Sequence, residues 1–181
     1  HPMYRRQRQM CIRDSTDALR HGLVELLPRL RRYAYALTGT PADADDLVQA
    51  CVERILTKGV PSDAALDRWS FRVCKNIWID EYRAQQRRNA LVEEIDIQDN
   101  DRTVEHEMVS LSTIAEVNNA MDQLSDDQRA ALSLVALEGF TYAEASETLC
   151  VPIGTIMSRI ARARKNLTNL LSDNTLALAE T

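Results

Sequence analysis

With 181 residues the chain is long enough for one or two domains, and a composition of 45% hydrophobic but only 5% aromatic residues, with few Gly and Pro, is typical of a soluble helical protein. It has no run of roughly eighteen apolar residues that could span a membrane and no recognisable signal peptide, so we expect a cytoplasmic protein. A net charge of -5 argues against a protein that coats nucleic acid, although local charge matters more for a DNA-binding protein.

The cysteines and histidines form no pattern that predicts a metal site, a disulfide framework or an enzyme. No C-x-x-C motif and no histidine cluster occurs, and three of the four cysteines lie among apolar residues, where we expect them to pack. A paired nucleophile and base, or a Gly-rich phosphate loop, is also missing from the sequence. We therefore predict no catalytic activity and no cofactor. The four cysteines are Cys11, Cys51, Cys74 and Cys150.

The two ends of the chain are set apart from the predicted fold. Residues 1–15 do not share the periodicity of the segment after them, so we interpret them as a non-native or disordered leader. A basic arm that touches DNA is the alternative interpretation of this segment. At the other end, residues 173–181 are expected to be a frayed tail.

Two amphipathic helices are predicted after the leader. Apolar residues recur at intervals of three and four over residues 17–37, despite Pro28. Thr40 and Pro41 then supply an N-cap and a first-turn proline for a helix over residues 41–58. The residues expected to be buried are Leu19, Leu23, Leu26, Leu27, Leu30, Tyr33, Ala34, Leu37, Leu47, Val48, Cys51, Val52, Ile55 and Leu56.

The second helix begins with acidic residues. Asp45 and Asp46 have no His, Ser or Lys partner nearby in the sequence, as acid/base catalysis would require. Acidic side chains at a helix N-terminus interact favourably with its dipole. Helix-start electrostatics or a protein-contact surface is therefore the preferred explanation.

A third, basic helix is predicted over residues 64–86, after a loop that contains Pro61. Its apolar stripe includes Trp69, which we place in the core, whereas Trp78 and Tyr82 could either pack or stack on unpaired bases. The expected stripe is Leu66, Trp69, Val73, Ile77 and Asp80.

Charge divides the chain into two basic modules with an acidic connector. Residues 68–88 carry a local charge of +4, and residues 153–170 again carry +4 with no acidic residue. Between them, residues 92–107 hold seven acids and one Arg, a charge of -6. The weak periodicity of residues 89–112 makes them the predicted linker.

A helix-turn-helix pattern lies after the linker. A helical pattern resumes at residue 114, and Ser125 with Gln128 predicts a capping box. Thr141 with Glu144 has the same spacing and begins the short first helix of the pattern. Pro152 closes that helix and opens a second one. Residues 141–167 as a whole make up the pattern.

The second helix of this pattern has two different faces. Its apolar face is expected to be buried, and its other face carries hydroxyl and basic groups that suit a DNA major groove. A solvated basic face on a structural helix explains the same periodicity, so the pattern alone leaves both interpretations open. The apolar face is Ile153, Ile156, Ile160, Ala163, Leu167 and Leu170; the polar face is Thr155, Ser158, Arg159, Arg162 and Lys165.

Two separated blocks of the sequence resemble the extracytoplasmic-function (ECF) sigma factors of bacterial RNA polymerase. The first block resembles sigma region 2 and the second resembles region 4. The first consists of Asp45-Asp46-Leu47-Val48-Gln49 with Trp69, Val73, Cys74, Asn76, Asp80 and Arg83; the second of Leu124-Ser125 to Arg129, Gly139 to Glu144, and Val151 to Arg164.

The resemblance implies an all-α fold of two small helical domains, a region 2 bundle and a region 4 helix-turn-helix, joined by a flexible acidic linker. It implies region 2 over residues 16–88 and region 4 over residues 113–172. Its implied partners are the core polymerase, through the beta-prime clamp helices and the beta flap, double-stranded and melted promoter DNA, and an anti-sigma factor.

The resemblance also implies roles for individual residues. Acidic and neighbouring residues of the second helix would bind the polymerase, the third helix and the loop of residues 59–64 would read and open the minus-10 element, and the last helix would read the minus-35 element. The polymerase contacts are Asp45, Asp46, Leu47, Gln49 and Glu53; the minus-10 contacts are Arg72, Lys75, Asn76 and Arg83; the minus-35 contacts are Thr155, Ser158, Arg159, Arg162, Arg164 and Lys165.

Some positions depart from the family pattern. Ala145 and Ser146 replace a common Ile-Ala pair, and Cys150 stands where a turn glycine is common. Met157 replaces a frequent basic residue, which removes a possible phosphate contact. The preferred DNA sequence therefore cannot be copied from relatives.

Two alternatives belong to other functional classes. A sigma-mimicking protein that sequesters an anti-sigma factor would not need the basic residues of the third and last helices. A dimeric helix-turn-helix regulator would leave the first block without a role and would need a dimerisation element that the sequence does not reveal.

Overall fold

A computed structural model describes the chain at residues 2–92 and 117–179, with side chains at residues 17–80 and 117–170. All labelled elements in these ranges are α-helices: α1 (Pro2–Thr38), α2 (Pro41–Lys58), α3 (Leu66–Val92), α5 (Asp126–Ala136), α6 (Tyr142–Leu149) and α7 (Ile153–Ala179). An all-α architecture is thus confirmed for the described part of the chain. Most of the predicted linker, from residue 93, lies outside it.

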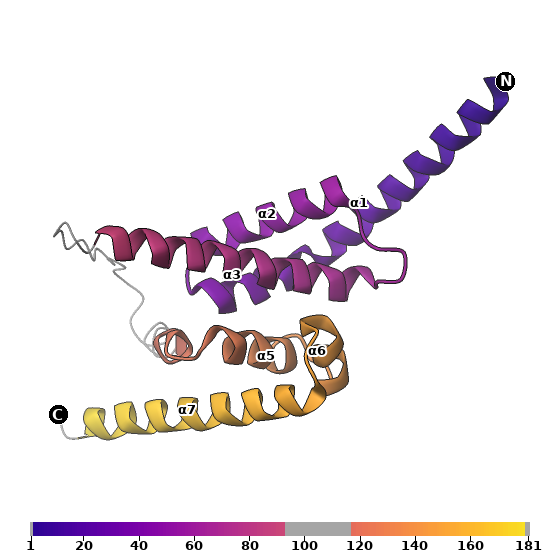
Figure 1. Ribbon diagram of the computed structural model, residues 1–181. Coiled ribbons are helices and arrows are strands. Elements are labelled where there is room, and N and C mark those ends of the chain that lie inside the picture. The colour runs from indigo at the N-terminus through magenta and orange to yellow at the C-terminus, as the bar shows by residue number, and fades with distance from the viewer. Residues whose placement is uncertain (1, 93–116, 180–181) are drawn as a thin grey trace.

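Helix α1 is longer than predicted. It runs without interruption from Pro2, so the boundary expected at residue 15 does not coincide with the end of an element. Its N-terminal part extends beyond the other helices (Figure 1). Likewise, α3 continues to Val92 and α7 to Ala179, past the ends predicted from periodicity. Backbone hydrogen bonding can continue a helix where no apolar stripe marks it in the sequence.

The ends of α2 are explained by its sequence. The Thr40 hydroxyl accepts a hydrogen bond from the Asp43 backbone N–H at 3.2 Å, and Pro41 occupies the first turn. Gly59 ends the helix with a positive φ of 77°, which a residue with a Cβ atom adopts only under strain. The predicted cap and the predicted boundaries of α2 are confirmed.

Helices α1, α2 and α3 pack around a core of mostly apolar side chains. Trp69, which was predicted to lie in the core, is only half-buried, whereas Phe71 and Trp78 are buried. Leu27 and Leu56, expected in the core, are 36% and 43% exposed because they lie at the edges of their helices' apolar stripes. The fully buried large side chains of this bundle are Tyr33, Phe71, Leu30, Leu37, Leu47, Ile55, Cys51 and Cys74.

One further core prediction is wrong, and the cysteines differ in burial. Asp80, placed on the apolar stripe of α3, is exposed. Cys150 is also exposed, whereas Cys51 and Cys74 are buried. Cys11 lies outside the residues whose side chains are described.

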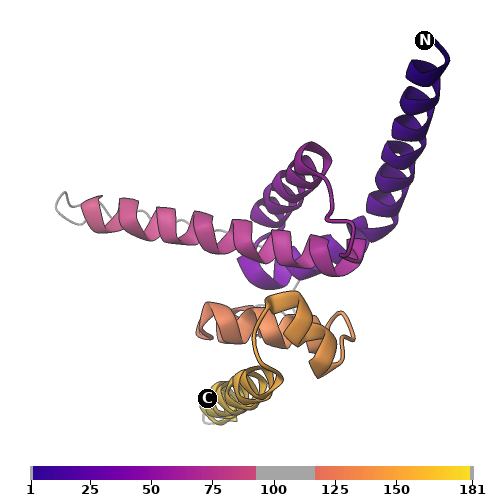
Figure 2. The same cartoon turned by 45° about the vertical axis from the view of Figure 1, so that its right-hand side comes forward.

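Helices α5, α6 and α7 form the C-terminal unit. Ser125 is the N-cap residue of α5, but its side chain makes no capping hydrogen bond, so the predicted capping box there is wrong. Asp126 and Asp127 favour this helix start through the helix dipole instead. Helix α7 lies on the far side of α5 from the α1–α3 bundle (Figures 1 and 2).

The two units share one hydrophobic core. The rings of Tyr33 and Phe71 meet edge to face with centroids 5.2 Å apart, and Phe71 meets Phe140, after α5, in the same way at 5.3 Å. The Arg29 guanidinium lies over both phenylalanine rings. Burial raises the pKa of the Tyr33 hydroxyl well above its ordinary value, so this hydroxyl stays neutral inside the core.

Polar contacts reinforce the same junction. The carboxylate of Glu138, fully buried, accepts hydrogen bonds from Arg29 at 3.0 Å and Arg32 at 2.9 Å. Buried Arg129 on α5 donates to the Leu37 carbonyl at the end of α1, at 2.7 Å. These contacts join α1 to the C-terminal unit.

Candidate functional site

The turn between α6 and α7 is built from a cap, a left-handed residue and a proline. Thr141 and Glu144 form the predicted capping box: the Thr141 hydroxyl accepts from the Glu144 N–H, and the Glu144 carboxylate accepts from the Thr141 N–H. Cys150 ends α6 with φ 54° and ψ 45°. The Pro152 carbonyl then accepts the Thr155 N–H at 2.9 Å as α7 begins. The helix-turn-helix is therefore confirmed.

The cap also changes the acidity of Glu144. Hydrogen bonds from the Thr141 backbone N–H and hydroxyl, with a smaller contribution from Arg68, lower the pKa of the Glu144 carboxyl below its ordinary value. The carboxylate is therefore ionised at neutral pH, as both the cap and the ion pair with Arg68 require.

The polar face of α7 is only partly free. Arg162, Arg164 and Lys165 are exposed, as expected for residues that contact DNA. Thr155 and Ser158 are half-buried, and the Ser158 hydroxyl donates to the Thr155 carbonyl at 3.0 Å.

Arg159 on the same helix is engaged within the protein. Its guanidinium forms an ion pair with Asp127 of α5 at 2.6 Å. Lys75 of α3 approaches the same carboxylate, with Nζ and Oδ1 4.0 Å apart. Asp127 thus brings together one residue predicted to contact the minus-10 element and one predicted to contact the minus-35 element.

The other minus-10 candidates lie along α3. The Arg72 guanidinium donates to the Thr148 carbonyl at 2.9 Å and to the Glu147 carbonyl, at the end of α6. Asn76 is exposed. Arg83 belongs to α3 but lies beyond the side chains that the structure describes.

Arg68, which was not among the predicted site residues, adds to the contact between α3 and α6. It pairs with Glu144 at 3.2 Å and with Glu147. No local pattern reveals this contact, because the partners are more than 70 positions apart in the chain. In this arrangement Arg68 and Arg72 of α3 face α6 rather than solvent.

The polymerase-binding candidates lie on α2. Asp45, Asp46, Gln49 and Glu53 are exposed, and Gln49 donates to Glu53 at 3.3 Å. Leu47, in contrast, is only 2% exposed. It is therefore a core residue, and its prediction as a contact residue is corrected: it lies on the side of α2 that packs against the bundle.

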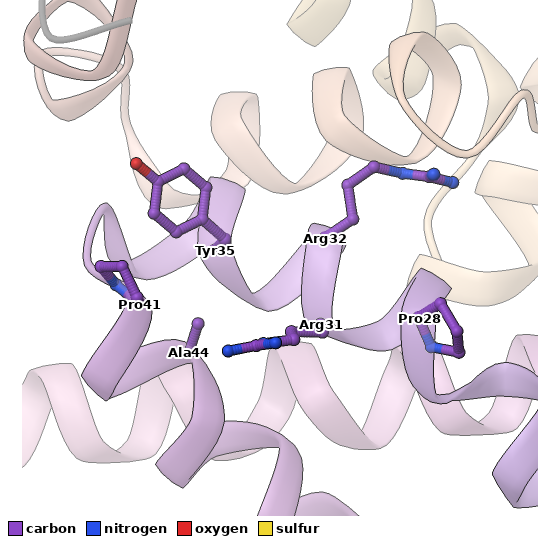
Figure 3. A pocket seen from close by; sticks show the side chains of 6 residues that line it. All are labelled: Pro28, Arg31, Arg32, Tyr35, Pro41 and Ala44. Carbon is purple, nitrogen blue, oxygen red and sulfur yellow. The ribbon is translucent and has the colours of Figure 1, made fainter. Parts of the chain in front are cut away.

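A pocket of about 350 Å³ lies between α1 and α2, beside these acids. The Arg31 side chain extends along it towards Ala44, whereas Arg32 points away towards the C-terminal unit (Figure 3). Both arginines are paired, Arg31 with Asp45 at 2.6 Å and Arg32 with Glu138. Among the described residues that line the pocket, no cation is therefore left unpaired to hold an anion.

Within the described residues, no cluster of three or more His, Cys, Asp or Glu side chains could hold a metal ion. None of the helices described has an apolar run that could cross a lipid bilayer.

Comparison with known proteins assigns both units. The family described as "Sigma-70, region 4" matches residues 114–167, and "Sigma2 domain of PhyR" matches residues 23–71. The ECF RNA polymerase sigma factor EcfG of Rhodopseudomonas palustris is 34% identical over 164 residues, which cover 86% of each chain. The chain belongs to the ECF sigma factors.

Other ECF sigma factors show the same likeness. SigE of Mycolicibacterium smegmatis is 32% identical over 84% of this chain and 61% of its own length. Among solved structures, the sigma factor RpoE of Bartonella quintana, in complex with the anti-sigma factor NepR, matches with a TM-score of 0.68. That match has 29% identity and covers 84% of this chain and 96% of RpoE. The resemblance that the sequence suggested is confirmed.

Proposed function

We propose that this ECF sigma factor binds core RNA polymerase, places α7 in the major groove of the minus-35 element and uses α3 at the minus-10 element. The observation that carries the proposal is the exposed cluster of Arg162, Arg164 and Lys165 on the second helix of a helix-turn-helix, in a segment without acidic residues. Such a cluster can contact phosphates on both sides of a groove. The protein would act in the cytoplasm, without catalysis of its own.

The exposed acids of α2 suit the polymerase contact. Asp46, Gln49 and Glu53 offer a polar, acidic surface to solvent. Asp45 would join this surface by exchanging its ion pair with Arg31 for one with the polymerase. Acidic surfaces of this kind guide association with basic partners.

Contact with the minus-10 element requires a change in the arrangement of the helices. Arg72 and Lys75 can reach DNA only after they leave the α6 carbonyls and Asp127. We infer that α3 separates from α6 when the polymerase and promoter are bound. A regulator that holds the two units together would keep the protein inactive, and an anti-sigma factor such as the one bound to RpoE is the expected partner of this kind.

A second candidate function is a sigma-like decoy for an anti-sigma factor. It is favoured by the match of residues 23–71 to the sigma2 domain of PhyR. Against it stand the exposed basic residues of α7, which a decoy would not need, and the similarity to EcfG over 86% of that protein.

Run-off transcription with core polymerase and a promoter library tests the proposal. We expect initiation that depends on this protein, and we expect Arg162→Ala with Lys165→Ala to abolish it. The logarithm of the promoter-binding constant falls linearly with the logarithm of the salt concentration. For the single change Arg162→Ala, the slope of this line should become shallower by about one unit, as expected for the loss of one phosphate contact.

The matched control is Arg20→Ala, which removes an exposed guanidinium from α1. It should leave initiation and the salt slope unchanged. Binding to core polymerase or to an anti-sigma factor without any initiation would overturn the proposal and favour the decoy.

A further inference from the structure

In the first nine residues of α7, residues 153–161, the exposed positions carry no polar side chain. Between residues 153 and 161 the exposed positions are Ile153, Gly154, Met157 and Ala161. Ile153 is 48% exposed and Met157 is 53% exposed. Ile153 was predicted to be buried, but it lies at the very start of α7, at the edge of the apolar stripe. Ile156 and Ile160 of the same stripe are buried.

Three of these side chains form one row. Ile153, Met157 and Ala161 are spaced four residues apart, so they lie one after another along the helix surface. We call these three residues the apolar ridge. Lys165 continues the row into the basic segment that follows, residues 162–165, where Arg162 and Arg164 are also exposed.

Two of the polar residues between positions 153 and 161 are engaged within the protein. Ser158 donates to the Thr155 carbonyl, and Arg159 is paired with Asp127. The exposed charges, at residues 162–165, thus follow the apolar ridge along α7 and are separate from it.

Groove chemistry connects these observations. In helix-turn-helix proteins the N-terminal residues of the second helix contact the base edges. The thymine C5-methyl group is the apolar feature of the bases in the major groove, and apolar side chains contact it. Arginine and lysine further along the helix can hold phosphates without reading sequence.

We propose that the apolar ridge, with Met157 at its centre, reads thymine methyl groups in the minus-35 element. This inference rests on the proposed function. Met157 has no charge that could hold a phosphate. It contributes sequence specificity instead, through contact with a methyl group. Its long, flexible thioether side chain can reach a methyl group that a shorter residue would not.

The charge around the apolar ridge argues for DNA rather than a protein partner. Arg162, Arg164 and Lys165 flank it, and residues 153–170 contain no acid. A polyanion such as DNA matches the basic part of this surface, next to the apolar ridge.

Uracil substitution tests the proposal, because deoxyuridine differs from thymidine only by the missing C5-methyl group. The holoenzyme first selects its minus-35 sequence from a randomised library. Each thymine of the selected duplex is then replaced in turn and promoter affinity is measured. We expect a loss of about three- to five-fold at one or two positions, the size expected for one buried methyl group.

The variant Met157→Gln keeps the length of the side chain but makes it polar. We expect it to bind the thymine and uracil duplexes equally well, while Met157→Leu retains the preference for thymine. Leu137→Gln, which changes a similarly exposed apolar residue outside α7, should behave as the unchanged protein. A melting curve for each variant shows that it is folded.

Three results would overturn the inference. In the first, the protein still binds the promoter, but uracil changes its affinity at no position. In the second, uracil lowers the affinity of Met157→Gln as much as that of the unchanged protein. Met157→Gln could instead weaken binding to core polymerase with unaltered DNA recognition, which would make the apolar ridge a protein contact. If no DNA is selected and no initiation occurs, the proposed function fails and the inference fails with it.

Discussion

Cys150 lies at the end of α6. Among the residues that the structure describes, it is the one residue other than glycine with a positive φ. A left-handed backbone costs a residue with a Cβ atom roughly 1–2 kcal/mol, whereas glycine adopts it freely. We predict that Cys150→Gly raises the free energy of unfolding by up to about 1 kcal/mol, after the greater entropy of the unfolded glycine chain is allowed for. Cys150→Val should lower it, because a β-branched residue tolerates this conformation least. Urea denaturation measures both.

The control for this prediction is Ala143→Gly, at an exposed position inside α6. There glycine should destabilise by about 1 kcal/mol, because the backbone is helical. Equal destabilisation by both glycine substitutions would contradict the role assigned to the Cys150 backbone.

At the scale of single residues, local spacing predicted the exposure of side chains where exposure depends only on the face of the helix that a residue occupies. The exposure of Arg162 and Lys165 results from their position opposite the apolar stripe. The pairing of Arg159 with Asp127 could not be predicted, because it depends on where α5 packs against α7. In the sequence, Asp127 looks like an ordinary acid in the first turn of a helix.

At the scale of the element, the capping box couples the stability of α6 to pH. The pKa of Glu144 is lowered in the folded protein, so its carboxylate stabilises the fold at pH values above the ordinary glutamate range. That stabilisation is lost as the pH falls through the lowered value. We predict that Glu144→Gln reduces stability at neutral pH and flattens the loss of stability on acidification. Urea denaturation at a series of pH values measures this effect.

Thr141→Ala removes the other half of the capping box. It should also reduce stability at neutral pH, by part of the amount lost in Glu144→Gln. Because the two residues act as one unit, the double variant should lose less stability than the two single changes add up to. Additive losses would mean that Glu144 acts through Arg68 alone.

The ends of helices were predicted where a residue enforces them. Thr40, Pro41 and Gly59 define α2 through hydrogen bonding and backbone conformation, which are local. Ser125 has a suitable side chain that nevertheless makes no capping bond, so a cap residue predicts a helix start better than it predicts the bond.

At the scale of the whole molecule, the two sigma units were predicted as separate domains, and their packing was not. Phe71 and Phe140 meet across almost seventy positions of sequence, and Glu138 accepts from two arginines of α1. Contacts of this range leave no periodic trace in the sequence. The charge pattern did contain a partial signal, since the basic side of α3 needs acidic or carbonyl partners such as Asp127 and the end of α6.

Asp127 is the residue through which this packing can be separated from DNA binding. Its carboxylate pairs with Arg159 and lies 4.0 Å from Lys75, so under the proposed function it would compete with DNA phosphates for both cations. If both cations contact the promoter as proposed, Asp127→Asn should raise promoter affinity about two- to five-fold at low salt, since partly exposed ion pairs contribute up to about 1 kcal/mol each. The gain should shrink as salt screens the charges. Fluorescence anisotropy with labelled promoter DNA measures the change, and Asp126→Asn, which removes the same charge one residue earlier, is its control. Equal gains from both variants would trace the effect to net charge and not to the ion pairs of Asp127.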